Sequence, residues 1–135
     1  MYQRLIPTIL GLLVLAIAPQ QLVADTTANT PTEAYLAYHQ ALQRGHHERA
    51  LWPYMTTEAR EDFESRFTPE LRNRMFFMMK ASSPRNIEVA DVRIENGRAT
   101  LELVPADPGN RTVGTAHMEQ EDGEWKVVDV VWQQR

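Results

Sequence analysis

The segment IEVADVRIENGRATLELV, residues 87–104, sets the fold class of this chain. Apolar and polar residues alternate on both sides of Asn96-Gly97, and this dipeptide between two alternating segments is a strong signal for a two-residue hairpin turn. We therefore expect strands at 87–95 and 98–104. One face should be core, and it consists of the cross-strand pairs Ile94 with Ala99, Val92 with Leu101, and Ala90 with Leu103.

A second hairpin is predicted at the end of the chain. Asp122-Gly123 is its turn, between a strand that ends at Gln120 and one that runs from Trp125 to about Gln133. Near the turn one face is apolar, but farther along apolar residues occupy both faces. A curved sheet or an oligomer contact would explain this pattern.

The residues before the first hairpin have helical periodicity. Thr30-Pro31-Thr32-Glu33 is typical of a capping box with proline in the first turn. Gly45 stands where a left-handed cap would end this first helix. A second helix begins near His47, and Pro53 should end or kink it. The expected buried stripe of the first helix is Ala34, Tyr35, Tyr38, Ala41 and Leu42.

Two more helices are expected before the break at 82–84. Thr56 or Thr57 caps a helix with Ala59, Phe63 and Phe67 on one side, and Thr68 caps the next. The predicted buried stripe of that last helix is Leu71, Met75, Met78 and Met79. Helices that precede an antiparallel meander predict an α+β domain in which one sheet face packs on the helices.

The first 24 residues are typical of a signal peptide, with Arg4 before an apolar run of 14 residues, 5–18. A helix that spans a membrane needs about 20 apolar residues, so this run is too short for a stable span. We therefore expect cleavage after Ala24 and no stable membrane span afterwards. The alternative is that the segment is kept as an uncleaved anchor. Residues 25–30 form a polar leader, and 31–135 form the domain. The expected location is periplasmic or secreted.

Composition excludes several classes of function. The net charge is −4, and −5 once Arg4 leaves with residues 1–24, with basic and acidic residues interspersed, so nucleic acid is not an expected partner. The chain has no cysteine, which excludes disulfides, thiol catalysis and cysteine-ligated metal centres. No cofactor motif is present.

Two segments carry a resemblance to a known superfamily. TPTEAYLAYHQALQRGHHERAL, residues 30–51, and GTAHMEQEDGEWKVVDVVW, residues 114–132, resemble the NTF2-like superfamily, in particular small exported bacterial domains of the DUF4878 and SnoaL-like kind. They cover about a third of the chain. The resemblance implies a cone in which a curved four-strand meander wraps the N-terminal helices around an apolar cavity. It also implies a possible homodimer through the sheet.

Histidines and methionines are the candidate metal ligands of this chain. His46 and His47 are sequence neighbours that point about 100° apart on a helix, and His39 lies across the Gly45 break, so we predict no metal site and expect the pair in solvent. Met75 and Met78 have a Met-x-x-Met spacing that could bind Cu(I). These methionines and Met79 lie on the expected buried stripe, however, so they are better explained as lining of the core or of a pocket.

Asp129 is the most informative candidate for catalysis. By strict alternation it shares the face of Trp125 and Val127, where burial would raise the pKa of its carboxyl group. Because an unpaired buried carboxylate is costly, we favour a bend or bulge near Val128 that turns Asp129 outward and leaves Val128, Val130 and Trp132 inside. The other members of the candidate set are Asp91, His117, Tyr35, Tyr38 and Tyr54.

Three functions follow as hypotheses. The favoured one is a non-catalytic module that binds a small apolar ligand or a protein partner in the cell envelope. The second is a SnoaL-like or ketosteroid-isomerase-like enzyme, with Asp129 or His117 as base and Tyr38 as donor. The third is a subunit of an envelope complex that exposes Val130 and Trp132 to a partner. The predicted ligand pocket is lined by Tyr35, Tyr38, Met75, Met78 and Met79.

Overall fold

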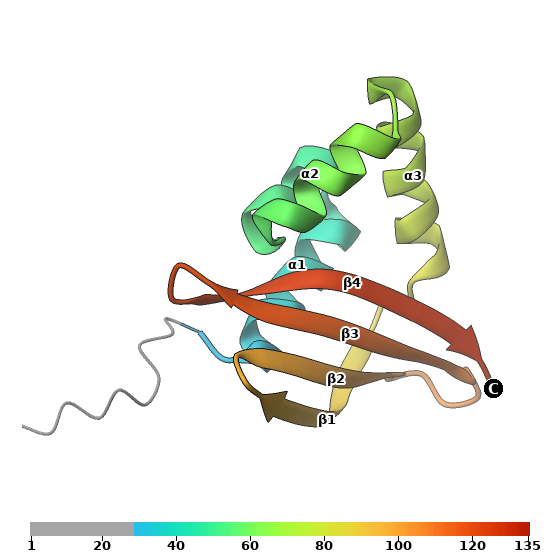
Figure 1. The fold of residues 1–135 in the computed structure, drawn as a ribbon. Coiled ribbons are helices and arrows are strands. Elements are labelled where there is room, and N and C mark those ends of the chain that lie inside the picture. The colour runs from blue at the N-terminus through green and yellow to red at the C-terminus, as the bar shows by residue number, and fades with distance from the viewer. Residues whose placement is uncertain (1–28) are drawn as a thin grey trace, which may run out of the picture.

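The structure is a computed structural model, and it describes residues 29–135. The predicted signal peptide and most of the predicted polar leader lie outside the described residues. The helices come first and the strands follow, which confirms the predicted α+β class (Figure 1). In chain order the elements are α1 (Pro31–Arg44), the 3₁₀ helix η1 (Glu48–Tyr54), α2 (Thr57–Arg66), α3 (Pro69–Ser82), β1 (Ile87–Glu95), β2 (Arg98–Pro105), β3 (Thr112–Glu121) and β4 (Glu124–Gln134).

The four strands form one antiparallel sheet in the order β1-β2-β3-β4, so the predicted meander is confirmed. Both hairpin turns are the predicted ones. Asn96 and Gly97 have φ of 51° and 72°, and Asp122 and Gly123 have φ of 52° and 76°. Positive φ at both central residues is the geometry of the tight turn that matches strand twist.

A bulge in β1 changes one predicted pair. Ile94 lies opposite Ala99 and Val92 opposite Leu101, as predicted, but the register then shifts and Val89, not Ala90, faces Leu103. The β2 side of this face is buried, whereas Val92 and Ile94 are 36% and 59% exposed. The prediction that the whole face is core is therefore wrong for β1, because this edge strand extends beyond the cover of the helices.

A second bulge lies in β4 at the position favoured from the sequence. The register of β3 with β4 shifts so that Val127 pairs with Met118 and Asp129 pairs with His117, which leaves Val128 as the extra residue. Val130 and Trp132 then pack against the core, while the Asp129 side chain is 55% exposed. The prediction that Val128 also faces inward was wrong, because the extra residue of the bulge is half-buried outside the core cluster and borders the same groove as Asp129.

The helix starts follow the predicted capping chemistry. The Thr30 side chain accepts a hydrogen bond from the Glu33 N–H, and the Glu33 carboxylate accepts one from the Thr30 N–H. Thr56 and Thr68 cap α2 and α3 in the same way, through their hydroxyl oxygens. These side chains satisfy backbone N–H groups that have no partner within the first turn of a helix.

Gly45 ends α1 but not in the predicted left-handed conformation. Its φ is −68° and ψ is 154°, an extended backbone that any residue can adopt. The requirement for glycine is instead one of space. A Cβ at this position would lie 2.6 Å from the Ala41 carbonyl oxygen, 2.9 Å from Ala50 Cβ and 3.1 Å from Phe76 Cζ.

The buried face of α3 differs from the predicted stripe. Phe76 is its one fully buried residue, whereas Leu71 and Met78 are 43% and 57% exposed. The prediction failed because α3 has apolar residues around most of its circumference, so periodicity does not single out one face. The predicted side of α2, with Ala59, Phe63 and Phe67, is half-buried.

The core lies between α1 and one face of the sheet. α1 contacts β1, β2 and β4 as well as η1 and α3, and its predicted stripe faces inward. The fully or nearly fully buried apolar residues are Ala34, Tyr35, Tyr38, Leu42, Leu51, Phe76, Ala99, Leu101, Leu103, Ala116, Met118, Trp125 and Val127.

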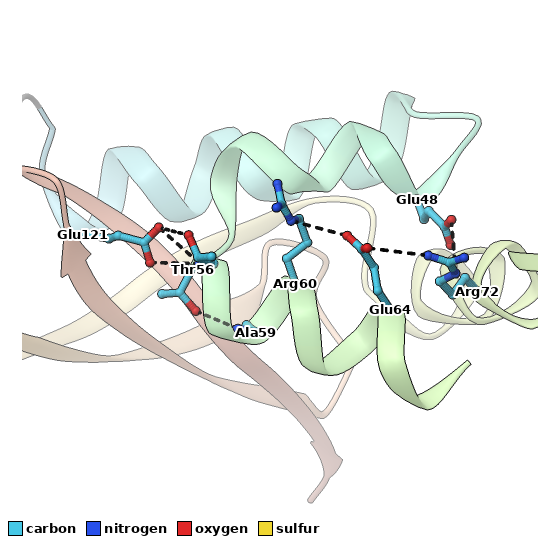
Figure 2. Close-up of polar contacts among 8 residues, drawn as sticks. Glu48, Thr56, Ala59, Arg60, Glu64, Arg72 and Glu121 are labelled. Carbon is cyan, nitrogen blue, oxygen red and sulfur yellow. Dashed lines mark hydrogen bonds and ion pairs between the residues drawn. The ribbon is translucent and has the colours of Figure 1, made fainter. Parts of the chain in front are cut away.

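Polar contacts join the helices to one another (Figure 2). Arg72 of α3 lies 3.8 Å from the carboxylate of Glu48, which is 5% exposed, and 3.9 Å from that of Glu64. Glu64 also pairs with Arg60 at 3.4 Å, and the Arg60 guanidinium stacks over the Trp52 ring. The chain of charges therefore ties η1, α2 and α3 together.

A carboxylate from β3 holds the start of α2. Glu121 accepts hydrogen bonds from the Thr57 N–H at 2.9 Å and from the Thr57 hydroxyl at 2.5 Å. These bonds, with the smaller effects of Lys126 and Arg60, lower the pKa of the Glu121 carboxyl group. The negative charge also faces the positive end of the α2 dipole.

Within residues 29–135, no helix combines the length and the apolar character needed to cross a membrane.

We expect Gly45→Ala to destabilise the protein by about 1–3 kcal/mol, because the added methyl group must displace backbone and buried side chains. Urea unfolding followed by circular dichroism measures the loss. Gly109→Ala is the control for the steric effect. No atom lies within 4 Å of a Cβ at this position, so the only cost of that substitution is the backbone strain of a φ of +90°. A Gly45→Ala variant as stable as the wild type would contradict the steric role.

We expect Glu121→Gln to lower stability by about 0.5–1 kcal/mol at neutral pH, a modest value because the site is exposed. Since the folded-state pKa is lowered, the wild type gains this stability above the unfolded pKa of about 4.3 and loses it as the pH falls through the folded-state value. Urea midpoints measured from pH 7 down to pH 3 should therefore converge for the two proteins. A constant difference across this range would exclude the proposed linkage, and Glu95→Gln serves as an exposed control.

Candidate functional site

A small cavity lies where α1, the end of α3 and the C-terminal half of β4 meet. Its volume is about 70 Å³, and its walls are mostly apolar, with two serines at the end of α3. The lining residues are Tyr35, Tyr38, Leu42, Met79, Ser82, Ser83, Val130 and Trp132.

Two tyrosines from α1 form one wall of the cavity. Tyr35 and Tyr38 are three residues apart, so they lie on the same helix face, and their ring centroids are 5.8 Å apart. The residues are only 1% and 4% exposed. Within residues 29–135 neither hydroxyl group forms a hydrogen bond to another residue, and neither belongs to the fully buried polar atoms that lack a partner.

Burial determines the protonation state of these tyrosines. Desolvation raises the pKa of both phenol groups well above the ordinary value, and the neighbouring Tyr38 raises that of Tyr35 further. Both hydroxyls therefore keep their protons at neutral pH and can donate hydrogen bonds.

The opposite wall depends on the bulge in β4 and on a glycine in β3. The bulge turns Val130 and Trp132 toward α1, and Trp132 lies opposite Gly114. A Cβ on Gly114 would lie 2.6 Å from two carbons of the Trp132 ring, so the glycine makes room for the indole. Sequence analysis did not identify Gly114, because only the cross-strand register reveals its contact.

Three of the five predicted pocket residues meet at this cavity. Tyr35, Tyr38 and Met79 line it. Met75 is half-buried and Met78 is exposed, and neither is part of its lining. The rim is closed by Ser82 and Ser83, whose hydroxyl groups donate to the Met79 carbonyl oxygen.

The candidate catalytic residues lie on two sides of the sheet. Asp129 and His117 meet on the outer face, with 2.5 Å between His117 Nδ1 and Asp129 Oδ1, whereas Tyr38 is on the inner face. The two residues lie opposite each other because the bulge moves Asp129 into the position across from His117. Of the remaining candidates, Asp91 is exposed on β1, and Tyr54 is half-buried in η1.

Asp129 also borders an open groove between α2 and the outer face of the sheet. The groove has a volume of about 870 Å³, and charged side chains dominate its lining, among them Glu61, Asp62, Arg98 and Glu119. Arg98 pairs with Glu119 at 3.4 Å. An open, charged and solvated surface of this kind does not desolvate a ligand as a buried cavity does.

The histidines occupy three different environments. His46 is exposed, whereas His47 caps η1 by accepting a hydrogen bond from the Arg49 N–H at 3.2 Å, so solvent exposure was predicted correctly for only one of them. His39 is buried and its Nε2 lies 3.0 Å from the Arg85 carbonyl oxygen. Among residues 29–135, no three His, Cys, Asp or Glu side chains cluster as metal ligands.

Val130 and Trp132 do not form the exposed patch that the partner-subunit hypothesis required. Both are half-buried against the core and line the cavity. The exposed apolar side chains lie elsewhere, on α1, α3, β1 and the outer side of β4.

Comparison with protein-family models, with curated proteins and with solved structures finds no match for this chain.

The tyrosine hydroxyls can be tested by substitution. Because neither hydroxyl forms a hydrogen bond to another residue within 29–135, the double variant Tyr35→Phe, Tyr38→Phe should change the stability at pH 7 by less than about 1 kcal/mol. Above the unfolded tyrosine pKa of about 10, the wild type should lose stability as the pH rises, since its folded-state pKa values are raised, and the variant should lose less. Urea unfolding at pH 8 and pH 11 measures both effects.

The matched control is Tyr54→Phe, which removes a half-buried hydroxyl outside the cavity. A loss of more than about 1 kcal/mol in the double variant at pH 7 would show that the hydroxyls have partners in the folded protein.

Proposed function

We propose that this protein is an exported NTF2-like domain that binds a small, mostly apolar ligand in the cell envelope without transforming it. The α+β order, the meander and the two resembling segments support the superfamily. The signal peptide predicted at residues 1–24 supports the location in the periplasm or outside the cell.

One observation carries the proposal, namely a mostly apolar cavity lined by two buried tyrosines whose phenol groups keep their protons. A ligand oxygen in the cavity could accept a hydrogen bond from either hydroxyl, which would contribute about 0.5–1.5 kcal/mol. The ligand is therefore an apolar group with an acceptor oxygen, such as a carbonyl or ether. Leu42, Met79 and Trp132 would contact its apolar part.

The size of the cavity limits what can enter. Sites for drug-sized ligands enclose about 300–1,000 Å³, whereas this cavity is about 70 Å³. It accommodates a small molecule or the end of a longer one. Ser82 and Ser83 at the end of α3 would then lie beside the part that remains outside.

An enzyme is the second candidate, and the His117–Asp129 contact favours it. Asp129 can orient the imidazole through Nδ1, which leaves Nε2 available as a base. Tyr38 is on the opposite side of the sheet, however, so it cannot act as the donor for a substrate at His117. The binding hypothesis needs no such partner and is the better supported one.

The test is native mass spectrometry of the protein purified from its natural host. We expect the wild type to carry a small-molecule adduct and the variant Met79→Trp to lose it, since the larger side chain fills the cavity. Met78→Trp is the matched control, because it adds the same bulk to an exposed position on the same helix. That variant should retain the adduct.

Two results would overturn the proposal. One is a wild-type protein that carries no adduct and whose melting temperature does not rise in a metabolite extract of the host. The other is an adduct that persists in Met79→Trp but disappears in Asp129→Asn, which would place the ligand at the outer face and favour the enzyme.

A further inference from the structure

β1 is an edge strand whose free side is open. It pairs with β2 on one side, and in the part of the chain that the structure describes no strand covers the other side (Figure 1). Seven of its nine residues are exposed. An uncovered edge presents unpaired backbone groups that can pair with another chain.

The hairpin turn shows which backbone groups point outward. Glu95 and Arg98 flank the two-residue turn, and such a flanking pair exchanges both of its backbone hydrogen bonds. Bonded and non-bonded pairs alternate along the ladder, so Arg93 is bonded to β2 while Val92 and Ile94 are not. The N–H and C=O groups of Val92 and Ile94 therefore point to the open edge.

The side chains on the outer face alternate in charge. Asp91, Arg93 and Glu95 are all exposed there, and Arg93 Nε lies 3.4 Å from Asp91 Oδ2 of the same strand. Val92 and Ile94 are on the inner face, 36% and 59% exposed. An edge with one sign of charge would repel a second copy, but this alternation is self-complementary in one antiparallel register.

β1 of one copy can pair antiparallel with β1 of a second copy about a two-fold axis at one of three residues. In each of these registers the outward N–H and C=O groups of the two strands meet. An axis at Arg93 sets Arg93 against itself and Asp91 against Glu95, so every charged pair is repulsive. An axis at Ile94 pairs Arg93 with Glu95 but brings the Asn96-Gly97 turn into the ladder. An axis at Val92 pairs Asp91 of each copy with Arg93 of the other and forms two attractive pairs.

We propose that two copies of this chain associate through β1, in antiparallel pairing about Val92, to form a continuous eight-stranded sheet. Asp91 and Arg93 of both copies then form a cluster of alternating charge on the outer face. Val92 of the two copies meets on the inner face, where its exposed surface becomes buried. The bulge at Ala90 ends the paired segment.

Charge substitutions test this register by sedimentation equilibrium of the purified full chain. Asp91→Arg makes both positions positive and Arg93→Asp makes both negative, so each variant alone should dimerise at least about tenfold more weakly than the wild type. An equimolar mixture of the two should form a heterodimer, because each pair is again attractive. The double variant Asp91→Arg, Arg93→Asp should dimerise like the wild type.

The controls separate this edge from other surfaces. Val131→Arg alters an exposed residue on the outer face of β4 and should leave dimerisation unchanged. The proposal is overturned if the wild type is monomeric at its highest soluble concentration. It is also overturned if Val131→Arg breaks the dimer, or if Asp91→Arg does not weaken it. Ligand binding at the cavity is independent of these three results.

Discussion

The bulge at Val128 determines which side chains of β4 face the helices. Before it, Trp125 and Val127 are buried, and after it the inward positions pass to Val130 and Trp132. A regular strand would instead direct Asp129 into the apolar core, and burying an unpaired carboxylate costs several kcal/mol. The inserted residue removes that cost. The same section of β4 also receives the chain between η1 and α2, where Thr56 N–H donates to the Val127 carbonyl oxygen at 3.0 Å.

The helical layer depends on one close approach and on one buried charge. Gly45 allows η1 and α3 to pack directly against the end of α1, where any side chain would collide with Ala50 and Phe76. Glu48, at the start of η1, faces Arg72 of α3. A buried ion pair contributes little net stability, but removal of one partner is strongly destabilising, so the pair favours this arrangement of helices over alternatives.

The sheet separates two chemical environments. Its inner face and α1 enclose the cavity with the protonated tyrosines, whereas its outer face carries His117, Asp129 and the ion pairs of β1 and β2. The proposed ligand would bind in the first environment, and the proposed self-association through β1 would use the edge between them. The two proposals are compatible, since the cavity and β1 share no residues.

The local chemistry of the sequence was enough to predict the α+β class, both hairpin turns and the three threonine caps, because each depends on residues within four positions of one another. The stripe on α1 was also predictable, since Ala34, Tyr35, Tyr38, Ala41 and Leu42 are spaced three and four residues apart. The bulge near Val128 followed from the cost of burying Asp129.

Other features depend on contacts between distant segments, which periodicity does not encode. Phe76 is buried in place of Leu71 because the position of α1 selects one face of a helix that is apolar on several sides. Gly45 and Gly114 are needed for space, and their neighbours are identified only when η1, α3 and β4 are in place. The cavity combines residues 35 and 132, so its size and its tyrosine wall arise only from the packing of the first helix against the last strand.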